Sequence, residues 1–414
     1  MQRVAEVSKS DMAEGGASRV AEELVIGLRL RGVSCEHWMG RCNKGFDYEH
    51  RFPLHDYHPR LTSRIRRIEG RLGIPDLLPF EDASITRSMR KRKYDVLHFH
   101  DLSSAISPDS VRLLARKCPT VWTFHDCSPF TGGCLYPMTC ERFKMGCGSC
   151  PQRHRWPLGG KFDCTRLLCS RKKALHSEGC VLTVAPSKWM ADMAMSSGML
   201  TVAPRVIPNG VDVNVFCPNG TQKDAKSFLG IDKERPVILV SANSLSDERK
   251  GAVYSFEAIR AIQDLRPFVI AVGNPNADIE RFLSGIDYLC TGFISDQRLL
   301  AKWYALADVF VFCSLADNMP LSILETMACG VPIVGFKTGG IPEIVEQGVT
   351  GFLVEQKDQV GLNDALRRAL TNGDVKKWGN ASRQKAMSEY AMDRFISAHM
   401  SLYDEVIAAF KEKQ

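Results

Sequence analysis

The 414-residue sequence has no long hydrophobic run. No stretch approaches the ~18 apolar residues that a membrane-spanning helix needs. A secretory signal is missing too, because charged side chains interrupt the first twenty residues at Lys9, Asp11, Glu14 and Arg19. We therefore expect a cytoplasmic protein. With 44% hydrophobic and 24% charged residues, the chain has the composition of a globular protein rather than a disordered one.

Two common phosphate-binding loops are also absent. The sequence contains neither a Gly-x-Gly-x-x-Gly fingerprint nor a Gly-x4-Gly-Lys-Ser/Thr loop. Because these loops hold the cofactor in nicotinamide dehydrogenases and the phosphates in P-loop kinases, both classes of enzyme are disfavoured.

Positive charge exceeds negative charge only in the N-terminal part of the chain. The net charge is +7, and residues 1–180 contain 30 Lys and Arg against 20 Asp and Glu, a balance of +10. The densest basic stretches are Arg64–Arg71 and Arg90–Lys93. Such runs are often no more than solvated surface. The alternative is contact with an anionic membrane or a phosphate-bearing acceptor.

Short apolar runs alternate with amphipathic stretches along the chain, a pattern that predicts parallel sheets in an α/β fold. A cluster of Gly and Pro near residues 206–220 separates two such series. We place the domain boundary at residue 205/206. The predicted strands are 4–7, 96–99, 121–124, 181–185, 237–240, 268–272, 309–312 and 333–336. The predicted helices include 17–30, 253–262, 299–307 and 321–329, with a last amphipathic helix over 390–413.

Ligands of doubly wound sheets bind at the carboxyl ends of strands, so the residues that follow each strand are the candidate site. Several of these positions carry small or charged side chains that suit a phosphate or a sugar, although packing turns and surface charge would give the same pattern. They are Gly15 and Gly16, His125, Arg249 and Lys250, and Asp317, with Glu325 inside the following helix.

Four of the fifteen cysteines lie in one loop, at Cys134, Cys140, Cys147 and Cys150. The closing Cys-Gly-Ser-Cys has the spacing of a metal knuckle, and four thiolates in a reducing compartment favour structural Zn²⁺ over disulfides. Free or redox-active thiols are the alternative, and Cys127 is a further candidate ligand. Four cysteines would leave no open position on the metal, so we expect no catalytic metal.

Taken in order, the motifs resemble those of a known family. They are Gly15-Gly16, Pro208-Asn-Gly-Val-Asp212, Lys250-Gly251, Asp317-x7-Glu325 leading into Met327-Ala-Cys-Gly-Val-Pro332, and Gly339-Gly-Ile-Pro-Glu343. This order resembles the retaining glycosyltransferases of family 4. Residues 122–151 further resemble transferases of bacterial exopolysaccharides and colanic acid.

The resemblance implies a GT-B fold, in which two doubly wound Rossmann-like domains face each other across a cleft. Residues 1–205 would bind the acceptor, residues 206–389 would bind a nucleotide-sugar donor with UDP or GDP, and helix 390–414 would pack back on the first domain. The acceptor would be a hydroxyl of a lipid-linked glycan, and the enzyme would lie at the cytoplasmic face of the membrane.

The resemblance also implies roles for single residues. Glu325 would bind the ribose hydroxyls, and Lys250 would bind the diphosphate and stabilise charge on the leaving group. Asp317, which is normally Glu in the family, would approach the sugar together with main-chain amides near Leu321 and Ser322. His125 would contact the transferred sugar, and Gly15-Gly16 would lie near the diphosphate and acceptor.

This sequence departs from the family pattern before Lys250. The usual Gly-Arg pair is replaced by Ser241-Ala-Asn-Ser-Leu, so Arg249 would supply the second cation. Retention is explained in this family by attack from the side of the departing diphosphate, which needs no carboxylate nucleophile, unlike a retaining glycosidase.

Two other functions are compatible with parts of the sequence. A sugar-nucleotide epimerase of GT-B architecture would share the nucleotide site and need no acceptor. A zinc-containing nucleic-acid-binding protein would account for the basic half and the cysteine loop. However, no recognition module is present and aromatic residues do not alternate with the basic ones, so we expect no nucleic-acid partner.

Overall fold

The computed structural model divides into two compact units. The first comprises Met1–Pro208 with Phe395–Gln414, and the second comprises Asn209–Arg394. The structure describes residues 2–12, 15–54, 59–103, 105–218, 226–227, 229–275 and 281–412. The boundary expected at 205/206 falls inside the short strand Arg205–Val206, just before the division after Pro208.

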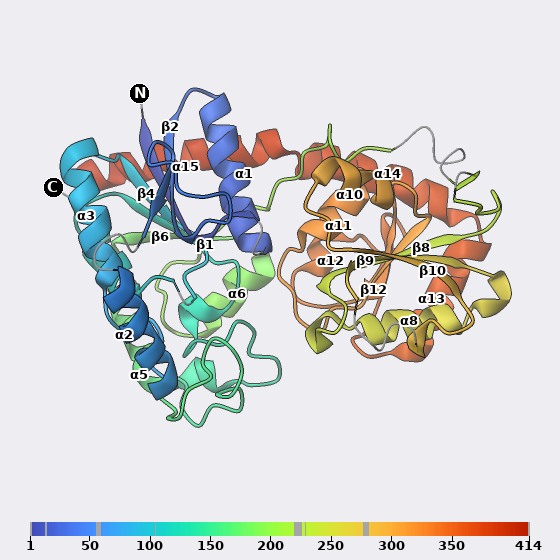
Figure 1. The fold of residues 1–414 in the computed structure, drawn as a ribbon, viewed down its shortest axis with the longest axis horizontal. Helices are drawn as coiled ribbons and strands as arrows, with labels where there is room; N and C mark the ends of the chain where they lie inside the picture. Colours follow the sequence, from blue (N-terminus) through green and yellow to red (C-terminus); the bar gives the residue numbers. More distant parts are fainter. Residues whose placement is uncertain are drawn as a thin grey trace. The chain divides into compact units, whose positions relative to one another are not determined.

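The first unit contains a parallel sheet of seven strands in the order β3-β2-β1-β4-β5-β6-β7 (Figure 1). The strands are β1 (Arg3–Ser10), β2 (Ser34–Arg41), β3 (Arg51–Pro53), β4 (Val96–Phe99), β5 (Thr120–Thr123), β6 (Val181–Ala185) and β7 (Arg205–Val206). The helices are α1 (Gly16–Leu30), α2 (Pro59–Leu72), α3 (Phe80–Arg92), α4 (Pro108–Ala115), α5 (Thr165–Ser177) and α6 (Lys188–Ser196).

The second unit contains a parallel sheet of six strands in the order β10-β9-β8-β11-β12-β13. The strands are β8 (Val237–Ser244), β9 (Phe268–Asn274), β10 (Asp287–Gly292), β11 (Val309–Phe312), β12 (Ile333–Phe336) and β13 (Gly351–Val354). The helices are α8 (Ala252–Arg260), α10 (Gln297–Tyr304), α11 (Leu321–Ala328), α12 (Ile341–Ile344), α13 (Gln359–Thr371) and α14 (Asp374–Glu389).

Both faces of the second sheet are buried, which explains the continuous apolar runs of its strands. Side chains alternate across a strand, so Leu239 and Phe310 pack on one face, whereas Ile238 and Val309 pack on the other. Helices α10, α11, α12 and α14 contribute to the first core, and α8 and α13 to the second. The loops after the strands are therefore anchored at one edge of a rigid sheet.

Helix α15 (Met392–Glu412) extends from the second unit along the first (Figure 1). It packs closely on α1, because a Cβ at Gly27 would lie 2.1 Å from Cδ1 of Ile396. Polar contacts also tie it to the first unit: Arg31 donates to Ser397 at 2.8 Å, and Gln2 donates to Asp404 at 2.6 Å. Its His399 and Tyr403 are fully buried, and they reappear below.

The eight predicted strands and the four internal helices are confirmed, with ends that differ by a few residues. Five strands were not predicted. The longest is β2, where Glu36 and His37 interrupt the apolar pattern. Both are buried because the fold supplies partners: Arg92 donates to Glu36 at 2.7 Å, and His37 contacts the Ser8 hydroxyl at 2.8 Å.

In the parts of the chain that the structure describes, no helix is both long and apolar enough to cross a bilayer. This agrees with the lack of long hydrophobic runs in the sequence.

Candidate functional site

Arg249 and Lys250 lie in a short 3-10 helix, Glu248–Lys250, directly after β8. Asp247 caps this turn by accepting from the main-chain N–H of Arg249 at 2.9 Å. Gly251 then adopts φ 63°, and a Cβ there would lie 2.0 Å from the carbonyl oxygen of Cys313. A glycine is thus required where the turn contacts the end of β11, and this contact sets the position of the two cations.

Asp317 lies opposite these cations, in the loop after β11. Lys250 Nζ lies 2.6 Å from its Oδ2, and Arg249 Nη1 lies 3.8 Å from the same oxygen. The Ser314 hydroxyl donates to this carboxylate at 3.1 Å. Arg249 also donates to the carbonyl of Ala316 at 2.7 Å. The three predicted residues Arg249, Lys250 and Asp317 therefore form one cluster.

Asp317 as a whole residue is only 7% exposed. Burial by itself would raise its pKa, but Lys250, Arg249 and the hydroxyl of Ser314 outweigh burial and lower the pKa below the ordinary 3.8. Asp317 is therefore ionised at neutral pH and is bound by cations, which does not suit a nucleophile or a general acid.

Helix α11 presents the other predicted residues of this unit. Pro320 is its N-cap. Leu321 and Ser322 form the first turn, and Glu325 is 3% exposed in the middle of the helix. The exposed amides of a helix N-terminus favour an anion or a sugar oxygen.

Three residues for which the sequence predicted no role bind the loop that carries Asp317, and Ser314 is one of them. The side-chain amide of Asn209 donates to the carbonyl of Met319 at 3.0 Å, and the N–H of Gly340 donates to the carbonyl of Asp317 at 3.4 Å. Asn209 belongs to the motif Pro208–Asp212, and Gly340 belongs to the motif Gly339–Glu343. Residues of both motifs therefore hold this loop in place by hydrogen bonds.

In the first unit, Gly15 and Gly16 lie at the N-terminus of α1, and Gly15 has φ 135°. A Cβ added at either glycine would meet no atom of the described residues within 4 Å. The glycines therefore have open space in front of the helix N-terminus, where a backbone N–H can contact a ligand directly.

His125 follows β5 and is partly exposed. Its Nε2 lies 3.0 Å from Nδ1 of His100, and the two rings stack with centroids 5.3 Å apart. Burial, followed by the neighbouring histidines, lowers its pKa well below the ordinary 6.5, so His125 is neutral at pH 7.

Two carboxyl groups, Asp101 and Asp126, lie at the ends of β4 and β5. Burial and the charge of Asp126 raise the pKa of Asp101 to about 7, and burial also raises the pKa of Asp126. A raised pKa in a pair of acids is typical of functional sites. The His100-Asp101 and His125-Asp126 dipeptides, each directly after a predicted strand, were the only signal for them in the sequence.

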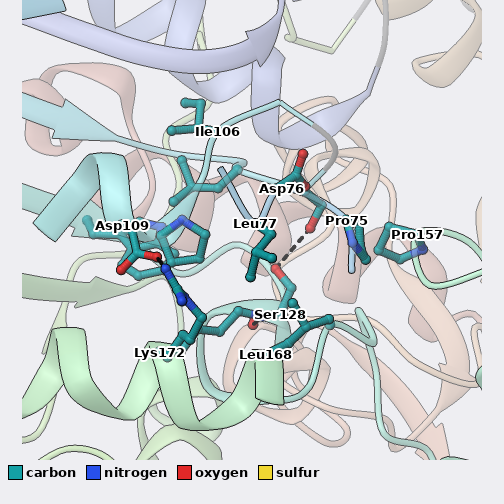
Figure 2. Close-up of a pocket in the computed structure, with 15 residues that line it drawn as sticks. Pro75, Asp76, Leu77, Ile106, Asp109, Ser128, Pro157, Leu168 and Lys172 are labelled. Carbon is teal, nitrogen blue, oxygen red and sulfur yellow. Dashed lines mark hydrogen bonds and ion pairs between the residues drawn. The ribbon is translucent and has the colours of Figure 1, made fainter. Parts of the chain in front are cut away.

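A cavity lies beside these strand ends (Figure 2). Its wall is largely apolar, and Asp76, Asp109 and Lys172 add polar groups. The ammonium of Lys172 donates to the carbonyls of Ser128 and Thr131, at 2.7 and 3.0 Å. The cavity encloses about 40 Å³, enough for a few water molecules but not for a sugar ring. Through Lys172, the wall of this cavity supports the loop after β5.

The four cysteines of the predicted zinc loop line one small cavity. The main-chain N–H of Gly132 donates to Sγ of Cys147 at 3.1 Å. Among the described residues, the only three metal-binding side chains whose ligand atoms lie within 4.8 Å of one another are Glu6, His98 and His100. In the described part of the chain, no three of the four sulfur atoms therefore all lie within that distance of one another. Cys127, the further candidate, is fully buried in the apolar core.

Comparison with known proteins identifies the family. A model described as Glycosyltransferase Family 4 matches residues 14–215, and one described as Glycosyl transferases group 1 matches residues 235–372. Together the two matches cover most of the chain. The chain belongs to the family 4 glycosyltransferases. The predicted enzyme class, a glycosyltransferase of EC 2.4, is thereby confirmed.

Relatives agree with this assignment. The putative colanic acid biosynthesis glycosyl transferase WcaC of Escherichia coli is 25% identical over 413 residues, which cover 94% of this chain and 98% of that protein. An N-acetyl-alpha-D-glucosaminyl L-malate synthase of Bacillus anthracis is 30% identical over 208 residues, 49% of this chain and 54% of that protein. This glycosyltransferase is an enzyme of glycan or polysaccharide biosynthesis, as the sequence predicted.

Solved structures confirm the fold class. Sucrose-phosphate synthase of Thermosynechococcus elongatus has a TM-score of 0.73 and 20% identity, covering 99% of this chain and all of that one. HepE of Anabaena in complex with UDP has a TM-score of 0.68 and 17% identity, covering 98% and 100%. At this level of identity the similarity shows the fold, which is GT-B.

The ion pair of Asp317 leads to a prediction about this glycosyltransferase. Asp317→Asn should lower the free energy of unfolding at pH 7 by about 1–3 kcal/mol, because Lys250 and Ser314 lose a charged acceptor. The pKa of Asp317 is lowered in the folded state, so the difference is complete well above pH 3.8 and disappears as the pH falls through the folded-state pKa. Urea unfolding of both proteins between pH 7 and 3 measures it.

Glu355→Gln is the matched control. Glu355 also pairs with a lysine, Lys337, at 2.8 Å, but its side chain is 75% exposed. The control should change the free energy of unfolding by less than about 0.5 kcal/mol. An Asp317→Asn variant as stable as the control at pH 7 would contradict the prediction.

Proposed function

We propose that this glycosyltransferase moves a sugar from a nucleoside diphosphate sugar, with UDP or GDP as the nucleotide, to a hydroxyl of a lipid-linked glycan, with retention of configuration. The observation that carries the proposal is the cluster of Arg249, Lys250 and Asp317 in front of the N-terminus of α11. HepE, which shares the fold, was solved with UDP and with UDP-glucose. WcaC is named for colanic acid biosynthesis.

Lys250 and Arg249 would bind the diphosphate. Only 22% of the Lys250 side chain and 30% of the Arg249 side chain are exposed, so a phosphate there meets two partly desolvated cations. Negative charge grows on the diphosphate as the sugar leaves. Fixed cations therefore stabilise the transition state more than the bound donor, which is the requirement for catalysis.

Glu325 would accept hydrogen bonds from the ribose hydroxyls, and the amides of Leu321 and Ser322 would bind sugar or phosphate oxygens. Asp317 would orient Lys250 and accept from a hydroxyl of the sugar. In the first unit, His125 would contact the transferred sugar, and Gly15-Gly16 would admit the diphosphate or the acceptor. The first unit would bind the acceptor and the second the donor.

Retention would follow from attack on the same side as the leaving diphosphate, whose oxygen accepts the proton of the acceptor hydroxyl. The state of Asp317 supports this route. A carboxylate held by Lys250, Arg249 and Ser314 is poorly suited to attack carbon.

The donor site is tested by Lys250→Ala and Glu325→Ala. Both variants should lose transfer by about 10²-fold or more while they keep the fold, because each removes a charged contact to the donor. The experiment first screens UDP, GDP and their sugars for thermal stabilisation of the wild-type protein, and then measures transfer with the donor that stabilises it.

Lys337→Ala is the control for Lys250, since this lysine is 45% exposed and pairs only with the exposed Glu355. It should transfer sugar like the wild type. Full activity in Lys250→Ala would contradict the site assignment. Conversion of the donor to an epimer without any acceptor would show the epimerase instead.

We also propose that Cys134, Cys140, Cys147 and Cys150 bind structural Zn²⁺. They line one cavity, and a run of left-handed residues from Gly146 to Ser149 forms the turn between the last two. The N–H of Gly132 on Sγ of Cys147 is the kind of bond that stabilises a zinc-bound thiolate. The ion would cross-link the loop that follows His125.

Metal analysis tests the zinc proposal. The purified protein should contain about one zinc ion per chain, and Cys150→Ser should lose most of it because one of four ligands is gone. Cys180→Ser is the control, since Cys180 is a partly exposed cysteine of the same unit outside the loop. Wild-type protein without zinc, or equal zinc in both variants, would contradict the proposal.

Peripheral contact with an anionic membrane is the last part of the proposed function. Helix α2 exposes an apolar stripe of Leu61, Ile68 and Leu72, which are 57%, 54% and 40% exposed. Exposed arginines lie beside the stripe, at Arg64, Arg67 and Arg71. An apolar stripe between cations is typical of a helix that lies in a membrane surface.

Vesicle sedimentation tests this contact. The protein should bind vesicles that contain phosphatidylglycerol more than vesicles of phosphatidylcholine alone, and the double variant Leu61→Ser, Ile68→Ser should bind about tenfold less. Val360→Ser, which removes a 72% exposed apolar side chain of α13, should bind like the wild type. Equal binding of the double variant and the wild type would contradict the role of α2.

A further inference from the structure

Behind His125 lies a fully buried group of polar side chains that the proposed function does not use. Glu6 of β1 lies opposite His98 of β4 in the parallel register, and His100 is two residues farther along the same face. Thr123 and His125 extend this face on β5. Helix α15 covers it with His399 and Tyr403, one turn apart.

The carboxylate of Glu6 is the centre of the group. Its Oε1 accepts from the Tyr403 hydroxyl at 2.6 Å, and its Oε2 accepts from Nε2 of His100 at 2.8 Å. Burial alone would raise the pKa of Glu6, but His98 and His100 outweigh it and lower the pKa well below the ordinary value. Burial together with His98 lowers the pKa of His100 to about 4. Glu6 is therefore ionised and His100 neutral.

These protonation states determine where the hydrogens lie. An ionised carboxylate only accepts, so the single ring hydrogen of His100 lies on Nε2 and points at Glu6. Nδ1 of His100 then carries a lone pair. The 3.0 Å contact to His125 is a hydrogen bond only if Nε2 of His125 donates. His125 therefore donates a hydrogen bond to His100, and His100 donates one to Glu6.

His98 fits the same order. Its Nδ1 lies 2.7 Å from the Tyr403 oxygen and 3.0 Å from Oε2 of Glu6, so it donates to this side. Its Nε2 lies 2.7 Å from the Thr123 hydroxyl. All ring nitrogens of His98 and His100 thus have partners of the correct kind.

We propose that Glu6 and His100 are positioning residues, which hold His125 neutral with its hydrogen on Nε2 and its Nδ1 as an acceptor. The inference rests on the proposed contact between His125 and the transferred sugar. Positive charge develops on the sugar ring as the bond to the diphosphate breaks. When Nδ1 of His125 accepts a hydrogen bond from a sugar hydroxyl, the electron density on the sugar rises. A positively charged imidazolium would instead repel the positive charge that develops on the sugar ring.

A metal ion is the competing interpretation, since Glu6, His98 and His100 offer three ligand atoms within 4.8 Å of one another. The hydrogen bonds favour the network. Tyr403 and Thr123 occupy hydrogen-bonding positions of Glu6 and His98. A metal ion bound to Oε2 of Glu6, Nδ1 of His98 and Nε2 of His100 would displace three of the hydrogen bonds in this group.

Nuclear magnetic resonance of the full-length protein, labelled with ¹⁵N in the histidine rings, tests the proposal without any ligand. In the wild type, His100 and His125 should both carry hydrogen on Nε2. The His125 hydrogen should be protected from exchange and should show a coupling across the hydrogen bond to Nδ1 of His100.

Two substitutions at one position separate the hydrogen bond from packing. His100→Asn offers an amide oxygen near the place of Nδ1, so protection of the His125 hydrogen should persist although the nitrogen coupling is lost. His100→Phe fills the space but accepts nothing, so protection and coupling should both be lost. Tyr403→Phe removes a bond to the other oxygen of Glu6 and should keep both signals even where it lowers the melting temperature.

Several results would overturn the proposal: a charged His125, a His125 hydrogen on Nδ1, or equal protection in His100→Phe and the wild type. Metal analysis of the same samples adds one more, namely a metal ion that remains in Cys150→Ser and is lost in His100→Asn. Failure of the proposed function looks different, because the wild-type signals would stand while His125→Ala transfers sugar normally.

Discussion

Parallel pairing of the strands is the constraint on which the rest of this enzyme depends. Consecutive strands that run the same way need a crossover, so every loop that follows a strand emerges at one edge of its sheet. Gly15, His125, Lys250 and Asp317 come from four different crossovers. Each is placed by a strand that is buried on both faces, and the candidate residues therefore rest on the most rigid part of each unit.

Each unit contains a buried carboxylate near the end of its sheet, and different partners stabilise the two charges. A carboxylate close to a buried edge needs partners for its charge. In the second unit, Asp317 obtains them from Lys250 and Arg249, the cations proposed to bind the diphosphate. In the first unit, Glu6 obtains them from histidines and a tyrosine, and the bonds lead to His125. In the second unit the partners of the buried carboxylate are themselves proposed to contact the substrate, whereas in the first unit one partner, His100, contacts the residue proposed to do so, His125.

Much of the fold could be predicted from the sequence. The runs that became β4, β6, β11 and β12 were predicted to the residue, because they are short and largely apolar. The strand β2 was missed, since Glu36 and His37 break that pattern and are tolerated only because Arg92 and Ser8 reach them. Ser314 was missed for a related reason. A single serine after a strand predicts no role unless the carboxylate that it contacts is known.

By itself, the sequence determined the α/β class, the family, and the residue types near the donor site, because local periodicity and short motifs carry that information. Only the tertiary structure decided that Lys250 and Asp317 form an ion pair, 67 residues apart, and that Tyr403 of α15 donates to Glu6, 397 residues away. The physical reason is that a hydrogen bond or an ion pair depends on distances of a few ångströms. Chain separation does not specify such distances, and they exist only once the sheets and helices have packed.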